Sequence, residues 1–285
     1  MKTEFKKNYP IEIYHQKDGH YSTSSLKRLL QSPLHFKYPP EQEPKKFFDI
    51  GSAVHTLLLE PHLWDKYFVV YDTDKRAEPE KTMASNKNKE WMAEIELKAE
   101  GKILITVKDK EEVDTMVERV LEDPFVVDLL SGPGWNEPSI YWTDFKRKQN
   151  LKTRPDRIRA NMVIVDIKTS ADASPEGFAR SVGKYRYDVQ AAMQVDGVQA
   201  HFKKKVPYYF YIAIETKPPY AHGVYLLKDD SIWTGRQTYK SLLDVINECE
   251  EKKEWPAYGY WAKQLPDKIL RTKVPHYINV NLYQY

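Results

Sequence analysis

The sequence contains a single cysteine, Cys249, among its 285 residues. One thiol cannot form a disulfide within the chain, and zinc or iron–sulfur sites built on thiolates need two to four of them. An internal disulfide and a thiolate-bound metal are therefore both excluded.

Long hydrophobic runs are also missing. Apolar runs such as residues 57–59 and 163–165 are far shorter than the ~20 residues that a membrane-spanning helix requires. The basic N-terminus MKTEFKKNYP continues into polar residues and not into the apolar core of a secretory signal. We expect a chain without a membrane span, without a secretory signal and with a cytoplasmic location.

The sequence has no strong excess of one charge. Its 44 Lys and Arg residues nearly balance 41 Asp and Glu residues, which leaves a net charge of +3. Nucleic-acid-binding domains are often much more basic, so any contact with DNA must come from local clusters. Core-forming residues, in contrast, are abundant, with 41% hydrophobic residues that include 20 Tyr, 10 Phe and 7 Trp. This composition predicts one large folded domain or two small ones.

Apolar periodicity and turn residues predict most of the regular structure. Helices are expected at residues 22–32, 49–59, 111–130, 175–202 and 231–250, and strands at 139–145, 151–159, 162–169, 206–216 and 222–227. The three strands between 139 and 169 have short connections and should form an antiparallel meander. We expect a flexible tail over residues 1–20, one folded domain over 21–260 with a long surface loop at 72–89, and a C-terminal tail over 261–285.

The predicted strand at residues 162–169 carries two residues of opposite charge. Side chains alternate between the two faces of a strand, so Asp166 and Lys168 share one face while the valines at 163 and 165 lie on the other. A D-x-K pair of this kind is most often a surface ion pair of little energetic value. Further residues are needed before the pair indicates catalysis.

A second carboxylate, Asp156, follows a proline on the preceding strand. Proline cannot donate to a sheet ladder, and so it marks an edge or a distorted position. Two antiparallel strands joined near residues 160–161 would bring Asp156 and Asp166 together. Two close carboxylates repel each other unless they share a cation or a proton, and oxygen ligands favour Mg²⁺ or Mn²⁺.

Five segments, taken in order, resemble one nuclease family. They are GSAVHTLLLEP, EPSIYW, KTRPDRI, VIVDIKTSAD and YRYDVQAAMQVDG. The set is similar to the nuclease domain of exodeoxyribonuclease VIII, the RecE-type recombination nuclease of prophages, within the RecB-like branch of the PD-(D/E)xK nucleases. The resemblance extends from about residue 21 to residue 255. It implies an α/β fold of the restriction-endonuclease type, with a central mixed β-sheet flanked by helices.

The resemblance also implies a metal site. It assigns His55, Asp156 and Asp166 as metal ligands, adds the backbone carbonyl of Ile167, and places the catalytic carboxylate Glu137 near the metal. The alternatives are ordinary ones, because most histidines in helices are structural and a carboxylate before a strand can be a plain loop residue.

Lys168 is the catalytic lysine that the resemblance implies. Its ammonium group could hydrogen-bond the attacking water or the scissile phosphate, and with a lowered pKa it could accept a proton. The sequence leaves these roles open.

Candidate DNA contacts lie on either side of this strand. Tyr187 and Gln190 are three residues apart and so share a helical face, from which they could reach a phosphate or orient the lysine. Arg154 and Arg157 could follow a DNA backbone, although a solvated basic hairpin would show the same pattern. The chain departs from the family pattern at Gln194, where a tyrosine is usual, which puts a tyrosine-specific contact there in doubt.

The resemblance implies a Mg²⁺-dependent exonuclease, with Mn²⁺ able to substitute, that degrades linear double-stranded DNA from 5′ to 3′. It further implies 3′ overhangs for phage-type recombination, a RecT-type single-strand annealing partner and a homotetramer. An iron–sulfur branch of the superfamily is excluded by the single cysteine. An endonuclease of the same fold and a non-catalytic DNA-binding scaffold are the alternatives, and the presence of Asp156, Asp166 and Lys168 argues against the scaffold.

Overall fold

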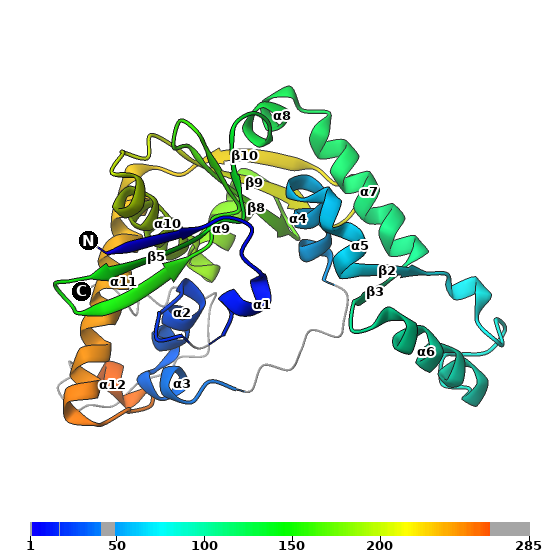
Figure 1. Cartoon of the computed structure of the whole chain (residues 1–285), viewed down its shortest axis with the longest axis horizontal. Helices are drawn as coiled ribbons and strands as arrows, with labels where there is room; N and C mark the ends of the chain where they lie inside the picture. Colours follow the sequence, from blue (N-terminus) through cyan, green and yellow to red (C-terminus); the bar gives the residue numbers. More distant parts are fainter. Residues whose placement is uncertain (1, 17, 41–48, 263–285) are drawn as a thin grey trace.

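A mixed five-stranded sheet forms the centre of the computed structural model, which describes residues 2–16, 18–40 and 49–262 (Figure 1). Its strand order is β10-β9-β8-β7-β4. The strands are β4 (Gly134–Asn136), β7 (Arg157–Arg159), β8 (Ile164–Ser170), β9 (Tyr209–Glu215) and β10 (His222–Leu226). Strands β8 and β9 are parallel, and the other neighbouring strands are antiparallel. The predicted mixed sheet is confirmed.

Helices cover both faces of this sheet (Figure 1). One face is covered by α4 (Ile50–Leu59), α7 (Val107–Leu121) and α8 (Pro124–Leu130), and the other by α10 (Tyr187–Phe202) and α11 (Asp229–Lys252). The alternation of β8 explains this arrangement, because Val165 and Ile167 are buried with residues of α4 and α7 while Ile164 is buried with residues of α10 and α11. The predicted two faces of this strand are confirmed.

The predicted strand at 151–159 is divided in the structure. Its first part is β6 (Gln149–Thr153), which pairs with β5 (Ser139–Asp144), whereas its second part is β7, which pairs with β8 in the main sheet. The break falls at Arg154, Pro155 and Asp156, and proline is a residue that cannot donate to a ladder. The expected meander is therefore two antiparallel pairs in different sheets, and Asp156 lies at the junction.

The N-terminal residues add a strand to the smaller sheet. Strand β1 (Thr3–Lys6) pairs antiparallel with β5, which gives the order β1-β5-β6. The ring of Phe5 lies 5.5 Å from that of Trp135 and 5.2 Å from that of Phe202, measured between centroids. These contacts explain why the structure differs here from the flexible tail expected over residues 1–20. The predicted domain boundaries at 21 and 260 stay a prediction.

Two predicted helices are each divided into two. The segment 111–130 forms α7 and α8, separated where Asp123 caps α8 and Pro124 begins it. The segment 175–202 forms α9 (Pro175–Tyr185) and α10, separated by Arg186 in the left-handed conformation at φ 51°. Periodicity continues across both breaks, because the apolar residues on either side pack into the same core clusters.

Asn88 organises the predicted surface loop at 72–89. Its side chain is fully buried, accepts a hydrogen bond from the backbone N–H of Glu78 at 2.8 Å and donates to the carbonyl of Glu78 at 2.9 Å and of Thr82 at 3.1 Å. The loop leads from β2 (Phe68–Tyr71) and the 3₁₀ turn η2 (Thr73–Lys75) to α6 (Asn86–Ala99) and β3 (Ile103–Thr106), and β2 and β3 pair in parallel.

The remaining elements are short or lie at the ends of the described chain. They are α1 (Ile11–Tyr14), α2 (Thr23–Gln31), α3 (Pro33–Lys37), η1 (Pro61–Leu63), α5 (Trp64–Tyr67) and α12 (Gly259–Ala262). Ser22 caps α2 as its position predicted, since its hydroxyl accepts from the backbone N–H of Ser25 at 3.3 Å. Most of the expected C-terminal tail, residues 263–285, lies outside the described residues. In the described ranges, none of the helices combines the length and the apolar character needed to cross a membrane.

Candidate metal centre

His55 reaches the main sheet from α4. Its Nε2 atom lies 2.9 Å from the backbone carbonyl oxygen of Ile167 on β8. In a neutral imidazole, a ring N–H that donates to a backbone carbonyl leaves the other ring nitrogen with a lone pair, which is the usual arrangement of a metal-binding histidine. Gly51 permits this close packing, because a Cβ atom at that position would lie 3.1 Å from the hydroxyl oxygen of Thr169.

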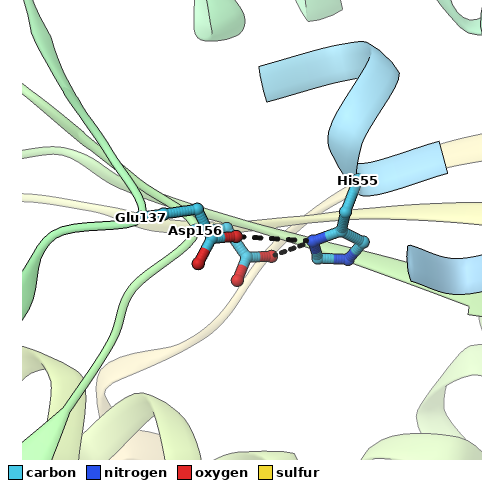
Figure 2. A group of neighbouring side chains, drawn as sticks. All are labelled: His55, Glu137 and Asp156. Atoms are coloured by element: carbon cyan, nitrogen blue, oxygen red, sulfur yellow. Dashed lines mark ion pairs between the residues drawn. The ribbon is translucent and has the colours of Figure 1, made fainter. Parts of the chain in front are cut away.

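Two carboxylates face the other ring nitrogen of His55 (Figure 2). The Nδ1 atom of His55 lies 3.5 Å from Oδ2 of Asp156 and 3.8 Å from Oε1 of Glu137. The ligand atoms of these three residues all lie within 4.8 Å of one another. One nitrogen and two carboxylates suit a divalent cation, so the side chains present fit a divalent metal, and its identity as Mg²⁺ stays a prediction.

Glu137 is held in place by its backbone and by a cation. Its backbone has φ 48°, a left-handed conformation that costs ~1–2 kcal/mol in a residue other than glycine. Its N–H donates to the carbonyl of Asp156 at 2.8 Å, and its Oε2 accepts from Nε of Arg154 at 2.8 Å. A strained residue whose carboxylate is aimed at a histidine and a second carboxylate is typical of a functional site.

Asp166 and Lys168 lie together on the opposite side of β8 from Val165, as the alternation predicted. Asp166 is fully buried and forms an ion pair with the ammonium of Lys168. Its other oxygen accepts from Nε2 of Gln190 at 2.8 Å and from Nε2 of Gln194 at 3.4 Å. Asp166 is therefore tied to α10 and does not belong to the three-residue group around His55, although it was predicted as a ligand of the same metal.

The charges of the centre shift its acid–base properties. Burial, together with the negative charge of Asp166, raises the pKa of Asp156 to about 7. Burial alone would lower the pKa of His55, but Asp156 and Glu137 outweigh it and raise this pKa to about 9. The metal-free centre thus keeps a proton on His55 at neutral pH, and a cation would have to displace that proton to use Nδ1.

Lys168 is held in its charged form. Burial lowers the pKa of its ammonium group, but Asp166 and Asp156 outweigh burial and raise the pKa above its ordinary value. A lysine in this state donates hydrogen bonds and does not accept protons. Of the two roles that the sequence left open for Lys168, the metal-free structure favours the hydrogen-bond donor over the proton acceptor.

Lys27 is a site residue that the sequence did not single out. Its Nζ lies 5.3 Å from the centroid of the Tyr187 ring, and Nζ of Lys168 lies 5.1 Å from the same centroid. Burial, and then the charge of Lys168, lowers the pKa of Lys27 to about 8. Within the described residues its ammonium has no hydrogen bond or ion pair. Nothing in the sequence marked it, because an isolated lysine on a capped helix is ordinary.

The two predicted DNA-contacting arginines are used inside the protein. Arg157 is only 4% exposed, and its guanidinium donates to Oδ1 of Asn136 at 2.6 Å and to the carbonyls of Leu129, Ser131 and Gly132. It therefore supports the fold and cannot follow a DNA backbone as expected. Arg154 donates to Glu137, and also to the carbonyl of Tyr9 at 2.7 Å. Its role in the structure is to position Glu137.

Comparisons with known proteins show the family and the fold of the chain. Residues 22–263 match the family described as "PDDEXK-like domain of unknown function (DUF3799)". A crystal structure described as a "Putative exonuclease" from Eubacterium rectale has a TM-score of 0.60 at 14% identity over 95% of this chain and 97% of that chain. The crystal structure of SSO0001 is also 14% identical, over 78% of this chain and 98% of that chain, but its TM-score of 0.28 is too low to indicate a shared fold. Among curated proteins, none matches.

The family match covers most of the chain and includes every residue of the centre. The likeness to the Eubacterium rectale structure, at this low identity, bears on the fold alone. Together with the mixed sheet and its flanking helices, these findings lead to one conclusion. The chain belongs to the PDDEXK-like family DUF3799 and has the fold of the PD-(D/E)xK nucleases.

Proposed function

We propose that this protein is a metal-dependent nuclease that hydrolyses phosphodiester bonds of double-stranded DNA. The carrying observation is the group His55, Glu137 and Asp156, placed beside the ion pair of Asp166 and Lys168. A family match to PDDEXK-like domains and a fold shared with a structure described as a "Putative exonuclease" support it.

His55, Glu137 and Asp156 would hold the metal in this proposal. Ile167 adjoins them, since its carbonyl meets His55 and its N–H donates to Asp156, and Asp166 is near enough for its charge to raise the pKa of Asp156. A divalent cation supplies two things to phosphodiester hydrolysis, a water that is nucleophilic near neutral pH and charge neutralisation at the phosphate. Arg154 keeps the Glu137 carboxylate turned toward the centre, since it donates to that carboxylate at 2.8 Å.

Lys168 would donate a hydrogen bond to a non-bridging oxygen of the scissile phosphate. Its raised pKa keeps the ammonium charged, and a positioned cation stabilises the negative charge that develops there in the transition state. Gln190 and Gln194 hold the carboxylate of Asp166, and that carboxylate in turn fixes Lys168. The two glutamines are thus positioning residues.

Lys27 would contact a neighbouring phosphate. Its ammonium and that of Lys168 share the ring of Tyr187 and repel each other. Two close cations without enough anions between them are stabilised by a bound anion. A DNA backbone carries such anions at regular intervals, so this pair fits two adjacent phosphates.

The finer assignments come from the motif resemblance. They are dependence on Mg²⁺ with Mn²⁺ as a substitute, digestion from 5′ to 3′ at linear ends to leave 3′ overhangs, a homotetramer, and work with a RecT-type annealing protein. The five ordered motifs of the sequence support this group of assignments as proposals.

Incubation with linear and with closed-circular plasmid in Mg²⁺ tests the proposal. We expect degradation of the linear form alone. Nicking of the circle would instead favour an endonuclease, and two intact substrates would favour a non-catalytic scaffold. A duplex labelled at either its 5′ or its 3′ end then tests polarity, since a 5′ to 3′ enzyme releases the 5′ label first.

A further inference from the structure

A cavity begins one residue beyond the catalytic lysine. It has a volume of about 480 Å³ and lies between the end of β8 and one face of α9. Its lining includes Thr169, Phe178, Ser181, Lys184, Tyr185 and Tyr187. Cavities of this size accept small organic ligands, and Tyr187 connects this one to Lys168, whose Nζ is 5.1 Å from the ring centroid.

Two tyrosine rings in the cavity wall stack on each other. The rings of Tyr185 and Tyr187 stack with 5.6 Å between centroids and 28° between planes, and Tyr185 is 48% exposed. The turn between α9 and α10 brings them together, because Arg186 adopts φ 51° between them. The guanidinium of Arg186 donates to both oxygens of Asp188, at 3.0 and 2.9 Å, and so holds this turn.

The rim of the cavity carries groups that suit a nucleotide. Nζ of Lys184 lies 5.1 Å from the ring centroid of Tyr185. Within the part of the chain that the structure describes, the hydroxyls of Thr169 and Ser181 make no hydrogen bond. An exposed aromatic surface next to cations is the usual means by which proteins bind the bases and phosphates of unpaired strands.

We propose that this cavity binds one nucleotide of the strand being cut, with its base stacked on the outward face of Tyr185 and unpaired from the complementary strand. This inference rests on the proposed nuclease function. A base that leaves the duplex stack to lie on Tyr185 between β8 and α9 cannot stay paired with its partner base. Unpairing costs least at a duplex end, where one stacking neighbour is already missing, so the cavity would favour DNA ends over internal sites.

A binding cycle tests the stacking without any cleavage. The affinity of the protein for a hairpin duplex with one free end is measured in EDTA, with an intact base or an abasic residue at each of the first few positions. For the wild-type protein we expect the abasic change to weaken binding ~10-fold at one position. For Tyr185→Ala the same change should have little further effect. Tyr185→Phe should behave as wild type, because stacking requires the ring and not the hydroxyl.

Tyr208→Ala is the matched control, since Tyr208 is 55% exposed and precedes β9 at the opposite end of the sheet from Thr169. In Tyr208→Ala the abasic residue should weaken binding as much as it does in the wild-type protein. A mismatch at the sensitive position should tighten wild-type binding, because the unpairing is then already done. Three results would overturn the inference. The abasic residue could lower the affinity equally in wild type and Tyr185→Ala, the mismatched end could bind with unchanged affinity, or the protein could fail to bind DNA ends.

The plasmid digestion separates this inference from the proposed function. If the wild-type protein cleaves linear DNA but an abasic residue does not change its affinity, the nuclease function is supported and the nucleotide-binding cavity is rejected. If an abasic residue lowers the affinity in a way that depends on Tyr185, but the protein cleaves no DNA in Mg²⁺ or Mn²⁺, the nucleotide-binding cavity is supported and the nuclease function is rejected.

Discussion

The carboxylate of Asp156 accepts a hydrogen bond of 2.7 Å from the backbone N–H of Ile167. This bond joins the start of β7 to the stretch of β8 between Asp166 and Lys168, and the carbonyl of the same Ile167 meets His55. The proposed metal ligands and the proposed catalytic lysine are thereby fixed to one point of one strand. This arrangement predicts how a substitution of each of these residues affects metal binding and cleavage.

Asp156→Asn and Asp166→Asn should separate metal binding from positioning. Both should lower cleavage ~100-fold or more, because each removes a negative charge at nearly constant volume. Asp156→Asn should also weaken Mn²⁺ binding strongly, whereas Asp166→Asn should weaken it less, since Asp166 lies outside the group around His55. Titration calorimetry measures the difference. Asp128→Asn is the control, because Asp128 pairs with Arg159 on the surface. Wild-type turnover in Asp156→Asn would contradict the metal centre.

Lys168→Ala should lower the cleavage rate ~10²- to 10³-fold while the metal affinity changes little. The ammonium is a hydrogen-bond donor and not a ligand, and it pairs with Asp166, which lies outside the three-residue group. Single-turnover cleavage and a Mn²⁺ titration on the same preparation measure the two effects. Collapse of metal binding in this variant would show that the lysine mainly supports the structure of the site.

His55→Ala should weaken metal binding ~10- to 100-fold and lower activity in parallel, with partial recovery at high Mn²⁺. Mn²⁺ accepts mixed nitrogen and oxygen ligands better than Mg²⁺ does. The competing view is that His55 only packs α4 against β8, through its contact with Ile167. That view predicts a lower melting temperature with unchanged metal affinity, so a melting curve and a metal titration decide between the two.

Metal affinity should rise with pH. A bound cation requires deprotonated ligands, and in the metal-free centre the pKa of His55 is raised to about 9 and that of Asp156 to about 7. Between pH 7 and 9 one proton must leave on binding, and below pH 7 a second must leave. The apparent affinity should thus fall ~10-fold per pH unit from pH 9 to 7 and more steeply below. A flat profile from pH 6 to 9 would show that these groups bind no metal.

Lys27→Met should affect stability and DNA binding in opposite directions. The side chain is half-buried, and its ammonium has no ion pair or hydrogen bond in the described part of the chain. Removing a half-buried charge without a partner should leave the melting temperature unchanged or higher, whereas losing a phosphate contact should weaken DNA binding and reduce its salt dependence by about one ion. Lys148→Met, at an exposed turn, is the control. A lower melting temperature with unchanged DNA affinity would make Lys27 a structural residue.

The sequence alone determined the elements that carry the centre. The capping serine before α2, the apolar spacing of α4 and the alternation of β8 are local patterns, and each depends only on residues near in the chain. The alternation placed Asp166 and Lys168 on one face, and the structure shows them paired there. The ordered motifs predicted the mixed sheet that the structure contains.

Only the tertiary structure decided which charged residues are available. Arg154 and Arg157 are close to the predicted metal ligand Asp156 in the sequence, but their guanidinium groups donate to Glu137 and to backbone carbonyls from segments distant in sequence. Lys27 is part of the site only because α2 packs beside α10, whose Tyr187 also contacts Lys168 of β8. Hydrogen-bond partners and burial depend on contacts between distant segments, and local spacing carries no information about them.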